Sequence, residues 1–212
     1  MLADGRCVRM EVLVVDLCGT LILENTTREF VRSLRLSLRA TLLRAFALSR
    51  VAAVLNNLAG RDLVRPLLIR CLRGHSKSGV EAAARDYVHR ALARKNNHRL
   101  LLEIHEAKLQ RRQVYLATAS LAAIAIAVVQ ELQLDGYVAS DLTYQADELC
   151  TGQLALDSTS NKWNLLLSRF PAFRDAHMTV VTDNPEDDDL MRHASVAYRI
   201  VGETILLEAK DV

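Results

Sequence analysis

EVLVVDLCGTLILENTT, residues 11–27, joins a short apolar run to one carboxylate, Asp16, and then runs into Gly19-Thr20. The Val- and Leu-rich run is typical of a strand buried on both faces of a parallel sheet. Sites in such sheets lie at the carboxyl ends of the strands. Asp16 is therefore the first candidate for a functional residue.

A long helical region follows this first strand. Residues 30–60 repeat apolar side chains every three or four positions, with arginines interleaved, which predicts helix as far as Gly60. Three more helices are expected over residues 61–74, 76–95 and 98–112.

Alternation of strands and helices resumes at residue 113. Strands are expected over 113–120, 136–155 (a hairpin turning near Ala146-Asp147), 177–182 and 196–201, with helices at 121–134, 160–170 and 187–194. This order predicts an α/β fold, a Rossmann-like parallel sheet core with an all-helical cap inserted after the first strand. We assign residues 1–23 and 113–212 to the core and residues 24–112 to the cap.

Composition excludes several classes of protein. Half of the 212 residues are hydrophobic and a quarter are charged, as in globular domains. No apolar stretch reaches the roughly 20 residues of a membrane-spanning helix, and we find no signal peptide. The cysteines form no CxxC pair, which argues against zinc and against a secreted disulfide scaffold: Cys7, Cys18, Cys71 and Cys150. A cytoplasmic protein is expected.

Charge divides the chain in two. Residues 24–112 hold 19 Lys+Arg and 7 Asp+Glu, whereas the remainder holds 8 and 18. Solvated faces of amphipathic helices explain the basic segment most simply. The alternative is a surface for an anionic membrane, because the arginines alternate with Leu and Phe. Nucleic acid is a less suitable partner, since no aromatic platform accompanies the arginines.

Polar groups end three of the expected strands: Asp16, Thr118 and Asp183. Lys162 opens a helix between the second and third of them. Carboxylates gathered at one point repel each other unless a divalent cation lies between them, and oxygen ligands suit Mg²⁺. A lysine and a hydroxyl beside that cation would bind a phosphoryl group. The residues therefore predict metal-assisted phosphoryl chemistry, with a carboxylate as a possible nucleophile.

Four segments in order resemble the motifs of the haloacid dehalogenase superfamily. VVDLCGTL (14–21) is similar to the first motif, VYLATAS (114–120) to the second, Lys162 to the third and VVTDNPEDDDLM (180–191) to the fourth. The helical insertion resembles the phosphoserine-phosphatase-like branch. The resemblance covers nearly the whole chain.

The resemblance implies a role for each matched residue. Asp16 would be the nucleophile that forms an aspartyl-phosphate, and Thr118, Ala119 and Lys162 would bind phosphate. Magnesium would be held by Asp16, Asp183, Asp187 and the backbone carbonyl of Cys18, with Asp187 also orienting Lys162. The cap would close over a small phosphorylated substrate and select it.

Cys18 departs from the family pattern. Phosphatases of the family carry an aspartate there, which protonates the leaving group and then activates water. A thiol is a poor substitute, because its ordinary pKa of about 8.5 would be raised by the neighbouring carboxylates. Since a general acid/base contributes about 10²–10⁴-fold, slow turnover is expected. Glu24 and His75 are candidate replacements by position alone.

The predicted function is a magnesium-dependent phosphomonoester phosphatase. Two alternatives use the same site differently: a phosphotransferase or dehalogenase-like enzyme, and a non-catalytic phosphate- or partner-binding protein whose acid/base was lost at Cys18.

Overall fold

A seven-stranded sheet forms the centre of the molecule in the computed structural model, which describes residues 9–59, 62–201 and 204–208. The strand order is β4-β3-β2-β1-β5-β6-β7. The strands are β1 Glu11–Val15, β2 Gln113–Leu121, β3 Gly136–Tyr144, β4 Cys150–Leu156, β5 His177–Thr182, β6 Val196–Val201 and β7 Thr204–Glu208. Five of them are parallel, and the two edge strands β4 and β7 run antiparallel to their neighbours.

The first strand lies in the middle of this sheet. Residues 12–15 of β1 pair in parallel with both β2 and β5. Leu13 and Val15 pack on one face, Val12 and Val14 on the other. Burial on both faces explains why the sequence of β1 is continuously apolar rather than alternating.

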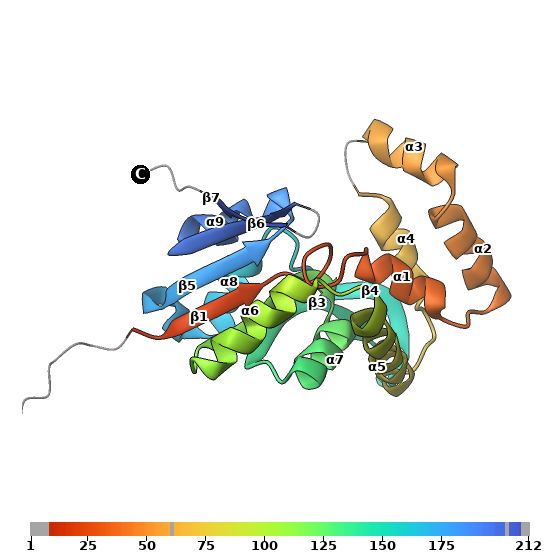
Figure 1. Cartoon of the computed structure of the whole chain (residues 1–212). Coiled ribbons are helices and arrows are strands. Elements are labelled where there is room, and N and C mark those ends of the chain that lie inside the picture. The colour runs from red at the N-terminus through yellow and green to blue at the C-terminus, as the bar shows by residue number, and fades with distance from the viewer. Residues whose placement is uncertain (1–8, 60–61, 202–203, 209–212) are drawn as a thin grey trace, which may run out of the picture.

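Six helices connect β1 to β2: α1 Thr26–Ser33, α2 Leu38–Ala47, α3 Arg50–Ala59, α4 Val64–Arg70, α5 Lys77–Arg94 and α6 His98–Leu109. α6 packs on β2 and so lies against the sheet, whereas α5 packs on α7 (Ala122–Leu132). Figure 1 shows α2 and α3 standing clear of it. The helical insertion after β1 is thus confirmed, whereas its limits at residues 24 and 112 stay a prediction.

The opposite face of the sheet is covered by α8 (Lys162–Arg169) and α9 (Asp188–His193). Leu166 of α8 and Leu190 of α9 are buried in the same cluster as Val12 and Val14. Two short 3₁₀ helices, η1 (Pro171–Asp175) and η2 (Pro185–Asp187), precede β5 and α9. With helices on both faces, the predicted α/β fold class is confirmed.

The expectation of one helical pattern from residue 30 to Gly60 was wrong. Three helices occupy this segment, because Ser37 and Ser49 act as N-caps. The hydroxyl of Ser37 accepts a hydrogen bond from the backbone N–H of Ala40 at 3.4 Å, and that of Ser49 from Ala52 at 3.2 Å. The expected stop at Gly60 lies outside the described residues.

The strand expected at residues 196–201 is confirmed as β6, but the strand that follows it was not predicted. β6 is followed by β7, which pairs with it in an antiparallel register from Val201↔Thr204 to Ala197↔Glu208. The segment TILLE has too little alternation of polar and apolar residues to predict a strand unaided.

Candidate active site

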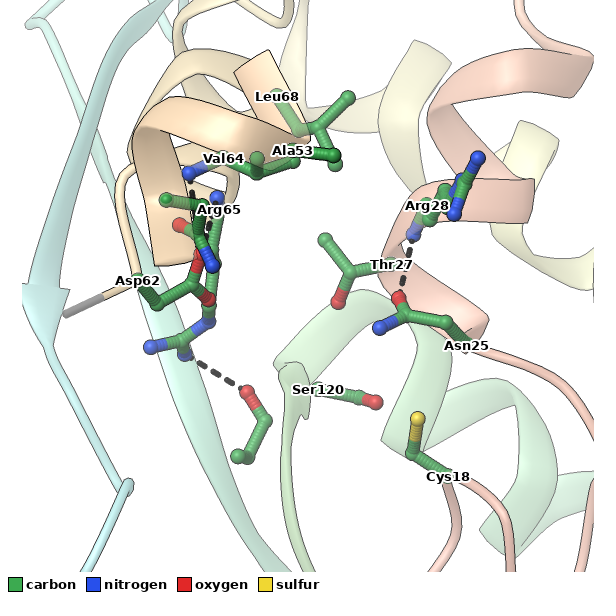
Figure 2. A pocket seen from close by; sticks show the side chains of 12 residues that line it. Cys18, Asn25, Thr27, Arg28, Ala53, Asp62, Val64, Arg65, Leu68 and Ser120 are labelled. Atoms are coloured by element: carbon green, nitrogen blue, oxygen red, sulfur yellow. Dashed lines mark hydrogen bonds between the residues drawn. The ribbon is translucent and has the colours of Figure 1, made fainter. Parts of the chain in front are cut away.

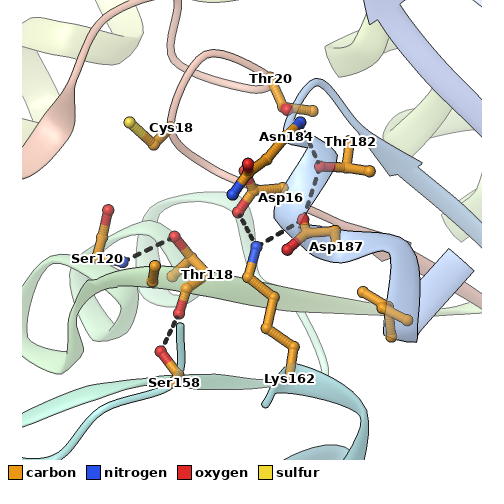
Figure 3. A network of polar contacts seen from close by, with 12 residues as sticks. Asp16, Cys18, Thr20, Thr118, Ser120, Ser158, Lys162, Thr182, Asn184 and Asp187 are labelled. Carbon is orange, nitrogen blue, oxygen red and sulfur yellow. Dashed lines mark hydrogen bonds and ion pairs between the residues drawn. The ribbon is translucent and has the colours of Figure 1, made fainter. Parts of the chain in front are cut away.

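The central strands β1, β2 and β5 end side by side, so their carboxyl ends form one side of the candidate site. Asp16 follows β1 directly, and its backbone N–H donates to the carbonyl of Val181 at 2.9 Å. Thr118 lies near the end of β2, and Asp183 follows β5. The parallel topology therefore gathers groups that are far apart in the sequence, as Figure 3 shows for Asp16 and Thr118.

A buried ion-pair cluster lies at these strand ends. The Lys162 Nζ is 2.9 Å from Asp16 Oδ1 and 2.7 Å from Asp187 Oδ2. The three side chains are 1%, 4% and 1% exposed, respectively. The hydroxyl of Thr182 donates to the same Asp187 oxygen at 2.7 Å. Lys162 is thus held between two carboxylates (Figure 3).

Burial and charge act against each other in this cluster. Burial alone would lower the pKa of Lys162, but the charges of Asp16 and Asp187 outweigh it and raise that pKa. Burial also raises the pKa of each carboxyl, and the single ammonium offsets this only in part. Asp183 adds a second negative charge close enough to raise the pKa of Asp16 further. The site therefore carries excess negative charge.

Gly19 and Thr20 bring Asp183 into place. Gly19 has φ +79°, and a Cβ there would lie 2.1 Å from Asp183 Oδ2. The hydroxyl of Thr20 donates to Asp183 Oδ1 at 2.7 Å and accepts from the Asp183 backbone N–H at 2.9 Å. Only glycine allows this close approach, and the threonine holds the carboxylate. Sequence reasoning missed the part played by Thr20 and by Thr182, although Gly19-Thr20 was itself a visible signal.

Thr118 is fully buried near the end of β2. Its hydroxyl accepts from the backbone N–H of Ser120 at 3.1 Å, and its carbonyl accepts from the hydroxyl of Ser158 at 2.7 Å. The adjoining Ala119 lines the cavity above Asp16. The structure thus brings this segment to the site with the Thr118 hydroxyl already engaged in a hydrogen bond.

Two neighbouring cavities share lining residues, among them Cys18 in the loop that follows β1. The core cavity, of about 630 Å³, is lined by Asp16, Lys162 and Asp183 among others. A second cavity of about 390 Å³, the cap chamber, lies between the inserted helices and the ends of β1 and β2. Figure 2 shows Asp62 and Arg65 on one wall of the chamber, Asn25 and Arg28 on the other, and Cys18 at its base.

Cys18 borders both cavities. Its side chain points away from the contact between Asp16 and Lys162 in Figure 3. Burial raises the pKa of its thiol to about 11, and the charges of Asp16 and Asp183 add to the effect. The group is therefore a neutral thiol at physiological pH.

Neither candidate replacement for the missing acid reaches the site. Glu24 accepts a hydrogen bond from the hydroxyl of Tyr87 at 2.9 Å, and the ring of His75 contacts the carbonyl of Leu72 at 3.1 Å. Within the part of the chain that the structure describes, neither side chain lines the core cavity or the cap chamber. Position in the sequence was thus a poor guide to a substitute.

Arg65 of α4 joins the inserted helices to the core. Its Nη1 donates to both oxygens of Asp157, at 2.9 and 2.8 Å, and to the hydroxyl of Thr159 at 2.9 Å. Its Nη2 donates to the carbonyl of Ala119 and to the hydroxyl of Ser140, both at 2.8 Å. Sequence analysis did not predict this link, which ties the wall of the cap chamber to Ala119 near the end of β2.

The donor set suits a hard divalent cation. Asp16 and Asp183 offer carboxylates to one cavity that Cys18 also lines, and Mg²⁺ is commonly held by one or two carboxylates and several waters. Asp187 Oδ1 is buried without a hydrogen-bond partner among the described residues. No cluster of three or more His, Cys, Asp or Glu side chains with metal-binding geometry occurs in the same part of the chain. The excess negative charge and the oxygen donors fit magnesium rather than zinc.

Comparison with known proteins identifies the fold. No family model and no curated protein matches the sequence. Among solved structures, an HAD family hydrolase from Salmonella enterica superposes with a TM-score of 0.62 at 18% identity, over 89% of this chain and 62% of that one. A phosphoserine phosphatase in its apo form gives 0.61 at 14% identity, over 89% and 85%. A protein of unknown function from Bordetella pertussis gives 0.69 at 12%, over 90% and 89%. The chain therefore has the fold of the haloacid dehalogenase hydrolases, and spans less than two thirds of the Salmonella chain.

Proposed function

We propose that this protein is a magnesium-dependent phosphomonoester phosphatase with Asp16 as its nucleophile, and a member of the haloacid dehalogenase superfamily. One observation carries the proposal. A fully buried ammonium, Lys162, bridges Asp16 and Asp187 at the wall of a cavity of about 630 Å³. Burying such a cluster costs free energy that an apolar core would not, and this cost supports a functional role for the cluster.

Asp16 begins the reaction by attacking phosphorus. A bond forms between its carboxylate oxygen and phosphorus as the bond from phosphorus to the ester oxygen breaks, and the departing alkoxide takes up a proton from water. Water then attacks the aspartyl-phosphate, which releases phosphate and restores the carboxylate. Lys162 stabilises the charge on the phosphoryl oxygens, and its contact with Asp16 favours the ionised carboxylate and orients it.

The remaining residues of the site divide between phosphate and metal. Thr118 and Ala119 would bind the phosphoryl group at the end of β2. Asp16, Asp183 and the Cys18 carbonyl would hold Mg²⁺, which would supply positive charge to offset the negative charge of the phosphoryl group. Asp187 Oδ2 is occupied by Lys162 and Thr182, which favours an orienting role for Asp187.

The polar residues that line the cap chamber favour a substrate whose leaving group can form hydrogen bonds. Asn25, Arg28, Asn56 and Asp62 line it, and Arg28 and Asn25 are exposed to solvent. Small phosphorylated molecules with hydrogen-bonding groups match these walls better than apolar ones.

A second function is favoured by one specific observation at Cys18. A thiol with a pKa of about 11 is neither an effective acid nor an effective base near neutral pH, and neither Glu24 nor His75 lines the two cavities among the described residues. The second candidate is accordingly a protein that binds phosphate compounds without turning them over.

Phosphate release from a generic phosphomonoester, measured with magnesium and with a chelator, tests the proposal. The wild type should turn over slowly and only with magnesium, and Asp16→Asn should abolish the activity. Asp175→Asn, at an exposed acid in η1, is the matched control and should keep it. Equal activity in the wild type and in Asp16→Asn would rule out Asp16 as the nucleophile. Phosphate binding without turnover in the wild type would favour the second candidate.

A further inference from the structure

Two helices of the insertion each expose a row of large apolar side chains. The row on α2 is Leu38, Leu42 and Phe46, and the row on α3 is Val51, Val54 and Leu58. Spacings of three and four residues place each row on one side of its helix. Leu38 is 77% exposed and Leu58 is 80% exposed. Figure 1 shows both helices, hereafter the α2–α3 pair, projecting away from the sheet.

The charge around these rows has one sign. No Asp or Glu occurs from residue 30 to residue 61. Arg35, Arg39 and Arg50 are exposed, and none forms a side-chain hydrogen bond or ion pair within the described residues. Arg44 differs, because its Nη1 donates to the carbonyls of Val31, Arg32 and Leu34 at 3.0–3.2 Å. Three arginines are therefore available to a partner, and one is used to hold the end of α1.

We propose that the α2–α3 pair docks on an anionic lipid surface. Apolar side chains enter the interface between headgroups and acyl chains, while neighbouring arginines contact anionic headgroups. A second copy of this chain is a poorer occupant, because a two-fold contact would set the same unpaired arginines against each other. Among the described helices, none combines the length and apolar character needed to cross a bilayer.

The docked orientation has a consequence for the cap chamber. Ala53 and Asn56 of α3 line that chamber, while Val54 and Leu58 of the same helix belong to the exposed row. Docking would therefore hold one wall of the chamber beside the headgroup layer. The docking itself depends on the surface of the α2–α3 pair and not on the chemistry at Asp16, so either proposal can fail alone.

Co-sedimentation of the full chain with vesicles tests the apolar part. The wild type should bind vesicles of phosphatidylcholine mixed with phosphatidylglycerol at low salt, and bind phosphatidylcholine alone far less. Leu42→Gln combined with Val54→Gln should weaken binding by about tenfold or more. The matched control, Leu102→Gln with Leu109→Gln, changes two exposed leucines of α6 and should bind like the wild type.

A second pair of variants tests the charge. Arg35→Gln with Arg39→Gln should weaken binding by about tenfold or more, whereas Arg85→Gln with Arg90→Gln on α5 should leave it unchanged. Absence of wild-type binding at low salt, or equal losses in the matched pairs, would overturn the proposal. So would sedimentation velocity showing a dimer that Leu42→Gln with Val54→Gln dissociates, since the rows would then bind a second copy.

Discussion

The core side and the cap side of the candidate site are built differently. On the core side, Asp16, Lys162 and Asp187 are buried and joined by short contacts. On the cap side, Asn25 and Arg28 are exposed, and the side-chain oxygen of Asn25 only caps α1. Groups fixed before substrate arrives suit the chemical step, because their reorganisation costs nothing during the reaction. Exposed and loosely held groups suit selection of the substrate.

Arg65 is the exception on the cap side. It is tied to Asp157 and to Ala119, a residue near the end of β2 that borders the core cavity. α4 therefore belongs mechanically with the core, whereas α2 and α3 stand clear of it (Figure 1). Hydrogen bonds to the core, and not membership of the inserted segment, therefore decide which inserted helices are held against the site.

Lys162→Met gives the largest expected effect, because it breaks the core side at its centre. The change leaves two buried carboxylates facing each other, which should cost about 3–5 kcal/mol in the free energy of unfolding. Turnover should be lost as well. Urea unfolding measures the first effect, with the exposed Lys77→Met as the control. If Lys162→Met lost no more free energy of unfolding than the control, the ion-pair cluster would not be what holds the core side together.

Cys18→Asp tests whether the core side lacks only its acid/base. Restoring a carboxylate there should raise magnesium-dependent phosphatase activity by about 10²–10⁴-fold. A large gain from almost no wild-type activity would favour the binding-protein alternative for the natural chain. Unchanged activity would show that more than one proton-transfer group is missing.

Arg65→Gln should loosen α4 and make it behave like α2 and α3. The expected loss in the free energy of unfolding is only about 1 kcal/mol, since Asp157 is 49% exposed and the ion pair is screened. Hydrogen exchange should speed up in α4 and not in α8. Arg70→Gln, at an exposed arginine of the same helix, is the control. Equal exchange in both variants would remove the distinction between α4 and the rest of the insertion.

The smallest expected effect is on the pH dependence of stability. Acid should abolish the difference in the free energy of unfolding between the wild type and Arg65→Gln. Burial would raise the pKa of Asp157, but hydrogen bonds from Thr159 and Arg65 outweigh it and hold that pKa below 3.8. The native state thus binds fewer protons than the unfolded state, so the contact stabilises fully above about pH 4 and is lost as the pH falls through the lowered pKa. The stability gap between wild type and Arg65→Gln should close in acid. A gap independent of pH would mean that Asp157 is not the partner that matters.

The sequence was sufficient where the pattern is local or where topology gathers strand ends. The apolar run of β1 predicted a buried strand, and Asp16 and Lys162 lie 2.9 Å apart as members of one site. The helix breaks at Ser37 and Ser49 were not predicted, because the apolar spacing continues through both residues. These errors concern helix limits and leave the fold class unaffected.

Contacts between segments far apart in the chain were out of reach. Arg65 and Asp157 are separated by 92 positions, and nothing in either neighbourhood distinguishes them from solvated surface residues. The hydrogen bond from Thr182 to Asp187 depends on the turn of η2, which places the acid back over the end of β5. Such links arise from packing in three dimensions, so the periodicity of a sequence does not report them.

Beryllofluoride binding tests the central claim, that Asp16 faces a preformed seat for a phosphoryl group. Beryllofluoride bound to an aspartate mimics an aspartyl-phosphate, so its binding does not depend on the acid/base lost at Cys18. Fluorine NMR with magnesium should show a bound signal in the wild type and in Cys18→Asp, and none in Asp16→Asn. Absence of a bound signal in the wild type, or its persistence in Asp16→Asn, would contradict the account.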